Sequence, residues 1–87
     1  MPRFFFDLYN DTTVTDDEGQ EFPDLQAAKN EAVRQVRRLI GGLVVETGTI
    51  DLLHFLQLRN EDGNIVHRIE FREAVRFLRG GRPVSRP

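Results

Sequence analysis

The first segment of the chain alternates apolar and polar residues, which is the period-two pattern of a β-strand. The pattern covers residues 3–9, with Phe5 as the single apolar residue on the polar side. The apolar side carries Phe4, Phe6 and Leu8. Residues 9–12 have turn chemistry, because Asn and Asp side chains can bond their own backbone, so residues 13–15 are predicted to return as a short strand.

The next periodic segment has the spacing of an amphipathic α-helix. Pro23 disfavours helical geometry at the residue before it, and Asp24 is suited to accept hydrogen bonds from the free amides of a first helical turn. Apolar residues then recur three and four positions apart, at Leu25, Ala28, Ala32, Val36 and Leu39. The spacing predicts a helix of about four turns that stops at residues 41–42, with residues 43–46 as an alternative extension.

A β-hairpin with its turn at residues 62–63 is the strongest local signal, because an Asp-Gly pair favours a two-residue hairpin turn. Such a turn pairs Glu61 with Asn64. The register that follows opposes three pairs of residues: Leu58 and His67, Leu56 and Ile69, His54 and Phe71. Both arms place their apolar residues on one face in this register, and a one-residue slip would turn one arm's apolar set to water.

These elements predict an α+β fold, in which one amphipathic helix packs on one face of a three- to four-stranded antiparallel sheet, in the order β-(β)-α-β-β. The face beneath the helix is predicted to hold the apolar residues that share one parity in each strand: Phe4, Phe6, Leu8, Ile50, Leu52, Leu56, Leu58, Ile65, Ile69 and Phe71. At 87 residues the chain has room for a single small core. Residues 1–79 are predicted to form that one domain, with residues 80–87 as a mobile tail because they lack core-forming periodicity.

The second face of the predicted sheet is left with four apolar residues: Phe5, Leu53, Phe55 and Val66. A patch of this kind is near the upper size limit for a monomer and is therefore expected to be covered. Either residues 74–78 fold back over it or a second copy of the chain does. Because the covering segment is so short, we predict that the four residues bind a partner, in a homodimer or with another protein.

Composition excludes several classes of protein. There is no cysteine, which rules out a disulfide framework, a thiolate zinc site and a cysteine nucleophile. Hydrophobic residues make up 39% and charged residues 30%, which is too apolar a balance for a disordered chain. The apolar runs are far shorter than the roughly 20 residues of a membrane span, and the first residues have no signal-peptide pattern. We therefore expect a cytoplasmic protein with no membrane partner.

Charge is divided unevenly along a chain whose net charge is −2. Residues 1–31 carry eight acidic residues against two basic ones, a net charge of −6. Residues 32–87 carry ten arginines against six acidic residues, a net charge of +4. The late arginines recur every three or four residues, at Arg68, Arg72, Arg76, Arg79, Arg82 and Arg86. They are suited either to follow phosphates or to meet the acidic N-terminal third of a second subunit.

The late arginines carry the alternative function, that of a nucleic-acid-associated regulator. Residues 72–79 are predicted to be either a short helix or a continuing strand. In a helix, Arg72, Arg76 and Arg79 line one face that can track phosphates, and together with Arg68 they are the candidate nucleic-acid contacts. Against this function, a dedicated nucleic-acid domain is usually basic overall, whereas the net charge here is −2.

Residues with catalytic or metal-binding chemistry are scarce and scattered. His54 and His67 share a face but lie about four residues apart along the ladder, roughly 13 Å, which is too far for one metal ion. The acidic residues 16–18 do not have the ligand spacing of a calcium loop and are predicted to form a solvated turn. The glycine pairs at 41–42 and 80–81 match no phosphate-binding loop. We therefore predict no catalytic residue, metal or cofactor, and expect the protein not to be an enzyme.

Three stretches of the chain resemble a known family. They are the opening Met1-Pro2-Arg3-Phe4-Phe5-Phe6-Asp7, the segment Asp17-Glu18-Gly19-Gln20-Glu21-Phe22-Pro23-Asp24-Leu25-Gln26-Ala27-Ala28, and the Asp62-Gly63 hairpin. Over residues 3–71 the chain resembles a family of short uncharacterised proteins, common in rhizobia and related α-proteobacteria and catalogued as a domain of unknown function. The resemblance implies a small cytoplasmic bacterial protein with a strand–helix–hairpin layout and no established site. A shorter likeness, at Pro23-Asp24-Leu25, is to HicB-type antitoxins, and it agrees with the alternative function.

Overall fold

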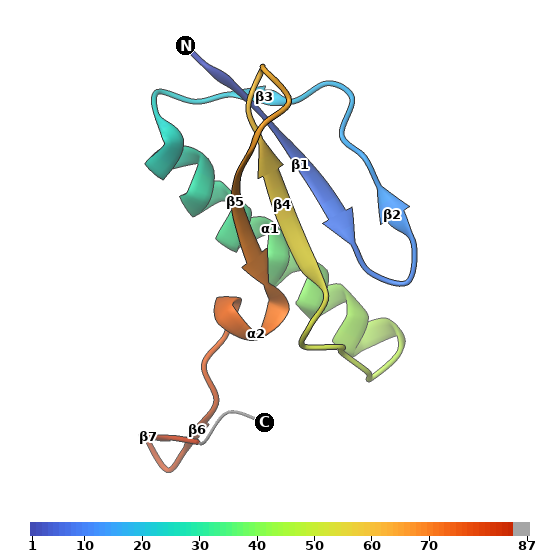
Figure 1. Ribbon diagram of the computed structural model, residues 1–87. Helices are drawn as coiled ribbons and strands as arrows, with labels where there is room; N and C mark the ends of the chain where they lie inside the picture. The colour runs from blue at the N-terminus through green and yellow to red at the C-terminus, as the bar shows by residue number, and fades with distance from the viewer. Residues whose placement is uncertain (85–87) are drawn as a thin grey trace.

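One long helix packed on one face of an antiparallel sheet is the plan of the protein, seen in a computed structural model that describes residues 1–84 (Figure 1). The strands of the main sheet, in chain order, are β1 (Arg3–Tyr9), β2 (Thr13–Val14), β3 (Gln20–Glu21), β4 (Phe55–Arg59) and β5 (Ile65–Glu70). Their spatial order is β2-β1-β4-β5, and β3 pairs with the start of β1. The predicted α+β class and the order of strand, helix and hairpin are confirmed.

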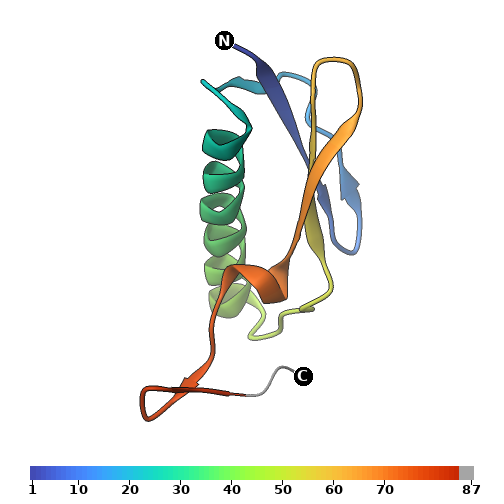
Figure 2. The same ribbon diagram turned by 60° about the vertical axis from the view of Figure 1, so that its left-hand side comes forward.

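The core lies between the sheet and the helix α1 (Leu25–Glu46). The helix covers one face of the sheet, and the opposite face carries no helix in the described part of the chain (Figure 2). The strands bury Phe4, Phe6, Leu56, Leu58 and Ile69. The helix buries Ala28, Ala32, Val36 and Ile40 against them. These five buried apolar strand residues all have the predicted parity, so the alternation of the sequence correctly identifies the core face.

α1 begins where the sequence predicts and runs one turn further. The Asp24 side chain caps its start by accepting a hydrogen bond of 2.8 Å from the N–H of Ala27. The predicted stop at residues 41–42 is wrong, because the helix continues through the alternative extension to Glu46. It ends before Gly48, whose positive φ of 67° lets its N–H donate to carbonyl oxygens of the last turn. Neither helix among the described residues has the length and apolar character that a membrane crossing requires.

The β4–β5 hairpin has the predicted register over most of its length, with Leu58 opposite His67 and Leu56 opposite Ile69. The predicted two-residue turn is wrong. The residue that faces Asn64 is Asn60 and not Glu61, and the N–H of Asn60 donates a hydrogen bond of 2.9 Å to the carbonyl oxygen of Asn64. The cause is the Asn60 side chain, whose Oδ1 accepts hydrogen bonds from the N–H groups of Asp62 (3.0 Å) and Asn64 (2.9 Å) and so closes a longer turn.

A β-bulge in β5 compensates for the longer turn. Arg59 pairs with Ile65. The next pair along the ladder is Leu58 with His67, so Val66 is an extra residue between the two pairs. As a result Ile65 is 63% exposed, whereas Val66 packs half-buried against the core. The predicted placement of Ile65 beneath the helix and of Val66 on the second face is therefore wrong.

The segment before β4 is a turn and not part of the predicted strand. Asp51 holds it, because Oδ1 accepts a hydrogen bond of 2.9 Å from the N–H of Leu53 and the carbonyl oxygen accepts one of 3.2 Å from the N–H of His54. The carbonyl oxygen of His54 in turn accepts a hydrogen bond of 2.7 Å from the N–H of Phe71, so these two residues do meet as predicted. The predicted strand residues that fall outside β4 are Ile50, Leu52, Leu53 and His54.

After β5 the chain turns into a short helix, α2 (Phe71–Ala74), that packs on α1. Nε of Arg37 on α1 donates a hydrogen bond of 2.8 Å to the carbonyl oxygen of Ala74, and Ala74 is buried. Because α2 stops at Ala74, the predicted arginine face of a helix over 72–79 does not form. The predicted fold-back of 74–78 over the helix-free face does not form either, since this segment starts against α1.

Residues 76–84 form an extension that we call the C-terminal arm. Within it β6 (Leu78–Arg79) pairs with β7 (Arg82–Pro83) as a small hairpin. Both views show the arm projecting away from the sheet and from α1 (Figure 1, Figure 2). Part of the predicted tail thus has a regular hairpin. The mobility of that tail stays a prediction, and its residues 85–87 lie outside the described residues.

Candidate binding groove

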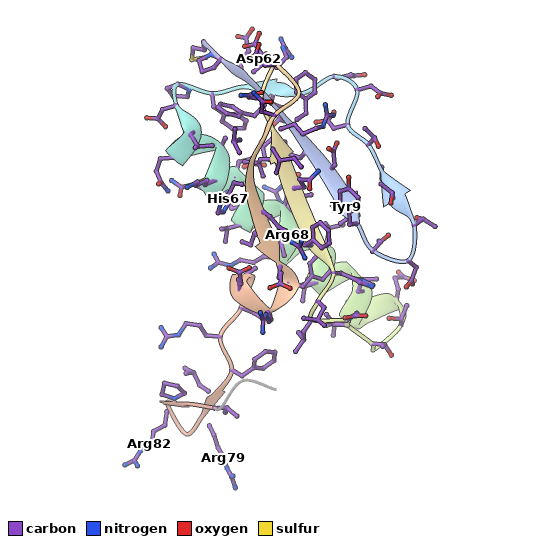
Figure 3. The ribbon with its side chains drawn as sticks, viewed as in Figure 1. Tyr9, Asp62, His67, Arg68, Arg79 and Arg82 are labelled. Carbon is purple, nitrogen blue, oxygen red and sulfur yellow. The ribbon has the colours of Figure 1, made fainter. Side chains whose placement is uncertain are left out.

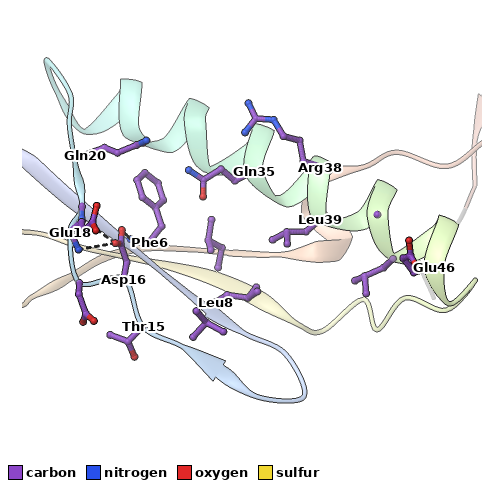
Figure 4. Close-up of a pocket in the computed structure, with 16 residues that line it drawn as sticks. Phe6, Leu8, Thr15, Asp16, Glu18, Gln20, Gln35, Arg38, Leu39 and Glu46 are labelled. Atoms are coloured by element: carbon purple, nitrogen blue, oxygen red, sulfur yellow. Dashed lines mark hydrogen bonds between the residues drawn. The ribbon is translucent and has the colours of Figure 1, made fainter.

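An open groove of about 940 Å³ lies between α1 and the outer edge of β1 (Figure 4). Its floor is apolar and is formed by Phe6, Leu8, Leu39, Leu43 and Leu56. Asp17 and Glu18 line it from the loop between β2 and β3, and Glu46 lines it from the end of α1. Among the charged lining residues Arg38 alone is basic. The groove therefore combines an apolar floor with a mainly acidic rim.

The groove exists because α1 does not lie centrally over the sheet. The helix packs mainly on β4, β5 and α2, which leaves Leu8 on β1 only half-buried. β2 and β3 are each two residues long, so they leave room beside the middle of β1. On the helix side the wall is flat at Gly42, where a Cβ atom would meet no atom within 4 Å. The apolar floor is therefore accessible from outside.

Asp16 holds the loop that forms the acidic wall of the groove. Its Oδ2 accepts a hydrogen bond of 3.0 Å from the N–H of Phe6, in the gap between β2 and β3. Its Oδ1 accepts hydrogen bonds from the N–H groups of Glu18 (3.1 Å) and Gly19 (3.0 Å). The predicted solvated turn is therefore wrong for Asp16, which is a half-buried anchor, whereas Asp17 and Glu18 are exposed.

The pKa of the Asp16 carboxyl group lies below its ordinary value. Burial by itself would raise this pKa, but hydrogen bonds from the three backbone N–H groups and the positive charge of Arg59 together outweigh the burial. The carboxyl group is therefore ionised at neutral pH. Its negative charge adds to the acidic character of the loop.

Beside this loop, Asp7 and Arg59 form a buried ion pair. Asp7 is 2% exposed, and both of its carboxylate oxygens accept hydrogen bonds from the guanidinium group of Arg59. Arg59 donates a further hydrogen bond of 3.0 Å to the carbonyl oxygen of Asp16. The N–H of Asp16 donates one of 3.0 Å to Oδ1 of Asp7. The pair therefore joins β1, β4 and the acidic loop, and its charges are satisfied by hydrogen bonds.

The four predicted partner-binding residues do not gather into one patch. Leu53 lies in the turn before β4, and Val66 packs against the core at the bulge. Phe5 and Phe55 are on the helix-free face, but at opposite ends of the β1–β4 ladder. The predicted gathering of these residues on one surface is therefore wrong, because the bulge and the turn redirect two of them. Their part in partner binding stays a prediction.

A stack of two aromatic rings and an arginine covers one end of the helix-free face. The rings of Tyr9 and Phe55 are nearly parallel, with an interplanar angle of 12° and centroids 4.8 Å apart. The guanidinium carbon of Arg68 lies 3.6 Å from the centroid of the Phe55 ring (Figure 3). The arginine therefore shields the ring from water and interacts favourably with its π face.

The four predicted nucleic-acid contacts lie in different settings. Arg68 belongs to the aromatic stack, and Arg72 pairs with a neighbouring glutamate at 3.0 Å. Arg76 and Arg79 belong to the C-terminal arm together with Arg82, and Figure 3 shows Arg79 and Arg82 pointing away from the domain. None of the three arm arginines forms an ion pair with any residue from 1 to 84.

The two histidines lie in separate environments, and neither lines the groove. Nε2 of His54 is 3.4 Å from Oδ2 of Asp51 and 3.7 Å from Oδ1 of Asp11. His67 is half-buried opposite a core leucine, and its pKa is lowered by burial and then by the positive charge of Lys29. Among residues 1–84 no group of three or more potential metal-ligating side chains comes together.

The C-terminal arm exposes apolar side chains that the sequence-based predictions did not identify as a binding surface. Phe77 is 52% exposed and Leu78 is 54% exposed. Val84 lies beside them, because its N–H donates a hydrogen bond of 2.8 Å to the carbonyl oxygen of Phe77. The available signal was the glycine pair at 80–81, which favours a reversal between two apolar segments.

The fold and the groove define a small α+β domain of strand, helix and hairpin, extended by an arm at its C-terminal end. Residues 3–72 match the family described as Domain of unknown function (DUF6894), and the chain belongs to this family. The predicted resemblance to a domain of unknown function is confirmed at that level, and the match ends before the C-terminal arm. Comparison with curated proteins and with solved structures found no match.

Proposed function

We propose that this protein is a small, non-enzymatic, cytoplasmic module that binds other polypeptides, and that its first partner is a second copy of itself. The observation that carries the proposal is the C-terminal arm, which holds Phe77 and Leu78 more than half exposed. Apolar side chains that project from a domain are stabilised when a partner removes them from water. The pairing of β6 with β7 supports the same proposal, because it presents these side chains in a fixed arrangement.

The oligomeric state of the full chain tests this proposal, by sedimentation velocity from micromolar to millimolar concentration. We expect reversible self-association of the native protein, with a dissociation constant raised by roughly tenfold or more in the Phe77→Ser/Leu78→Ser variant, because two side chains lose their burial. Val45→Ser is the matched control, since Val45 is 82% exposed but lies outside the arm. A native protein that stays monomeric throughout would contradict self-association, and unchanged association of the double variant would contradict the arm as its site.

A second candidate function, nucleic-acid regulation, is favoured by the arginines of the same arm. Arg76, Arg79 and Arg82 stand on one projecting segment and have no ion pair with residues 1–84. Contacts between arginines and phosphates strengthen as the salt concentration falls. If this function holds, fluorescence anisotropy will detect binding to duplex DNA or RNA at low salt, and Arg79→Glu/Arg82→Glu will abolish it. Binding that is absent even at low salt rejects this candidate.

A further inference from the structure

The C-terminal arm and the groove lie at opposite edges of the same molecule. The groove borders β1 and β2, at one end of the sheet order β2-β1-β4-β5, whereas the arm follows α2, which continues from β5 at the other end. α1 lies between them, because it presents Leu39 and Leu43 to the groove and Arg37 to α2. The helix therefore separates the arm from its own groove. A second copy of the chain offers the same groove without this obstacle.

The arm and the groove carry opposite charges. The arm has three arginines, Arg76, Arg79 and Arg82, and no acidic residue in 76–84. The groove rim has three exposed acidic residues, Asp17, Glu18 and Glu46. None of these six side chains forms an ion pair with any of residues 1–84. Complementary charge of this kind speeds encounter and sets the orientation of two surfaces.

The apolar parts of the two surfaces match as well. The arm presents Phe77, Leu78 and Val84 to solvent, all of them at least 46% exposed. The groove offers an apolar floor of leucine and phenylalanine side chains. Gly42 keeps the helical wall flat beside that floor, with no atom within 4 Å of the position that a Cβ would take. A hairpin can therefore lie against α1 without first displacing a side chain there.

We propose that the C-terminal arm of one copy docks in the groove of a second copy, with the apolar side chains of one face of its hairpin on the groove floor and its arginines against the acidic rim. The proposal rests on the self-association proposed above and names its site. In a two-fold dimer the contact is made twice, so the assembly closes and both grooves are filled. The apolar contact supplies most of the affinity, and the charges select the orientation.

Charge reversal tests the docking. Arg79→Glu/Arg82→Glu in the arm and Asp17→Arg/Glu18→Arg in the groove rim should each raise the dissociation constant by roughly tenfold or more at low salt. An equimolar mixture of the two variants should associate again, because opposite charges then meet at both contacts of the mixed dimer. Asp62→Arg, at the tip of the β4–β5 hairpin, is the matched control and should associate like the native protein. Circular dichroism establishes that each variant is folded.

Disulfide formation gives a second test that does not depend on charge. The chain has no cysteine, so Leu78→Cys in one copy and Gly42→Cys in another place single thiols in the arm and the groove. Docking should bring their Cα atoms to roughly 4–7 Å, and mild oxidation of the mixture should yield a covalent dimer. Gly41→Cys is the matched control, because a Cβ at either glycine meets no atom within 4 Å and only Gly42 lines the groove. We expect several-fold more crosslinking at position 42.

The results distinguish the docking from self-association itself. A native protein that is monomeric at every concentration overturns both proposals. The native protein could self-associate while the mixture of the two charge-reversed variants does not, or while crosslinking is equal at positions 41 and 42. Either result leaves self-association standing and overturns the docking of the arm in the groove. Recovery in the mixture together with preferred crosslinking at Gly42 supports the docking.

Discussion

At the scale of single residues, a short polar side chain accepts a backbone hydrogen bond that a neighbouring strand would otherwise accept. Asp16 accepts the N–H of Phe6 in the gap between β2 and β3 and at the same time holds two N–H groups of its own loop. The buried pair of Asp7 and Arg59 fixes the same loop from the other side. The acidic wall of the groove is therefore rigidly supported from within, although its outer residues are solvated.

Replacing Asp16 by Asn should lower the free energy of unfolding by about 1–3 kcal/mol near neutral pH, because a charged acceptor of three N–H groups is lost. The pKa of Asp16 is lower in the folded than in the unfolded chain, so the unfolded chain binds more protons. This stabilisation is present above roughly pH 4 and is lost as the pH falls through the folded pKa. Urea unfolding at several pH values should show that the native protein and the variant differ less in free energy of unfolding as the pH falls.

The neighbouring change Asp17→Asn is the control for this experiment, because Asp17 is exposed and accepts no hydrogen bond that anchors the loop. We expect it to change the free energy of unfolding by less than about 0.5 kcal/mol. If the native protein and Asp16→Asn differ in free energy of unfolding by the same amount down to acid pH, the charge of Asp16 is not what stabilises the loop.

Replacing Arg59 by Met should destabilise the protein by about 3–5 kcal/mol, because Asp7 is then left charged, buried and without its partner. The double variant Asp7→Leu/Arg59→Met removes both charges and should regain much of that loss. Thermal and urea unfolding of the three proteins give the comparison. If the single variant proved as stable as the double one, the loss of its partner by Asp7 would not be what destabilises the protein.

At the scale of elements, α1 is unusual because it continues through two adjacent glycines. A glycine inside a helix is less favourable than alanine by about 0.5–1 kcal/mol, because it loses more backbone freedom on folding. A Cβ at Gly41 would meet no atom within 4 Å, so no close contact requires the missing side chain. The last turns of α1, which line the groove, are therefore its least stable part.

Gly41→Ala should raise the free energy of unfolding by about 0.5–1 kcal/mol, because alanine fits the helical backbone and has fewer unfolded conformations. Gly48→Ala should have the opposite effect, since the φ of Gly48 is 67° and alanine is strained there. Urea unfolding monitored by circular dichroism measures both changes. A destabilising Gly41→Ala would mean that this part of the helix needs its flexibility.

Elements were predictable from the sequence where one local signal acted alone. Asp24 sets the start of α1, and the apolar parity of β4 sets its register against β5. Prediction failed where two local signals competed. The Asp-Gly pair favours a two-residue turn, but the carboxamide of Asn60 captures two N–H groups and forms a longer one. The glycine pair in α1 suggests a stop, but the helix is extended by packing and by the later Gly48.

The candidate site was less accessible to sequence reasoning than the fold. The groove depends on where α1 lies over the sheet, which local periodicity does not specify. The pair of Asp7 and Arg59 is diagonal across the ladder, because Asp7 lies opposite Gln57 and Arg59 opposite Phe5. The sequence did indicate that acidic and basic regions of two copies are complementary. It did not indicate which acidic residues border an apolar surface.

At the scale of the whole molecule, the protein is longer than its core requires. Its dimensions are 43 × 27 × 19 Å and its radius of gyration is 14.1 Å. A compact domain of this length has a radius of gyration of about 12 Å. The C-terminal arm projects beyond the sheet and α1 and extends the molecule in that direction (Figure 2). An arm of this kind adds surface for contact without adding to the core.

The melting temperature should therefore depend on protein concentration. Association that requires the folded state stabilises it by mass action, and each tenfold increase in concentration should raise the melting temperature by a few degrees in a domain of about this size. Differential scanning calorimetry of the native protein and of Phe77→Ser/Leu78→Ser makes the comparison. The melting temperature of the variant should rise less over the same concentration range. A native protein whose melting temperature does not depend on concentration would contradict association of folded copies.

β5 is an outer strand of the main sheet, and the bulge at Val66 interrupts its regular ladder. An outer strand with an unbroken row of N–H and C=O groups is a template on which further chains can stack without limit. The extra residue bends and twists this template, and the charge of Arg68 on the same strand adds to the effect. Fibre-like aggregation through this edge is therefore disfavoured, and the protein can remain dispersed at concentrations at which its copies meet often.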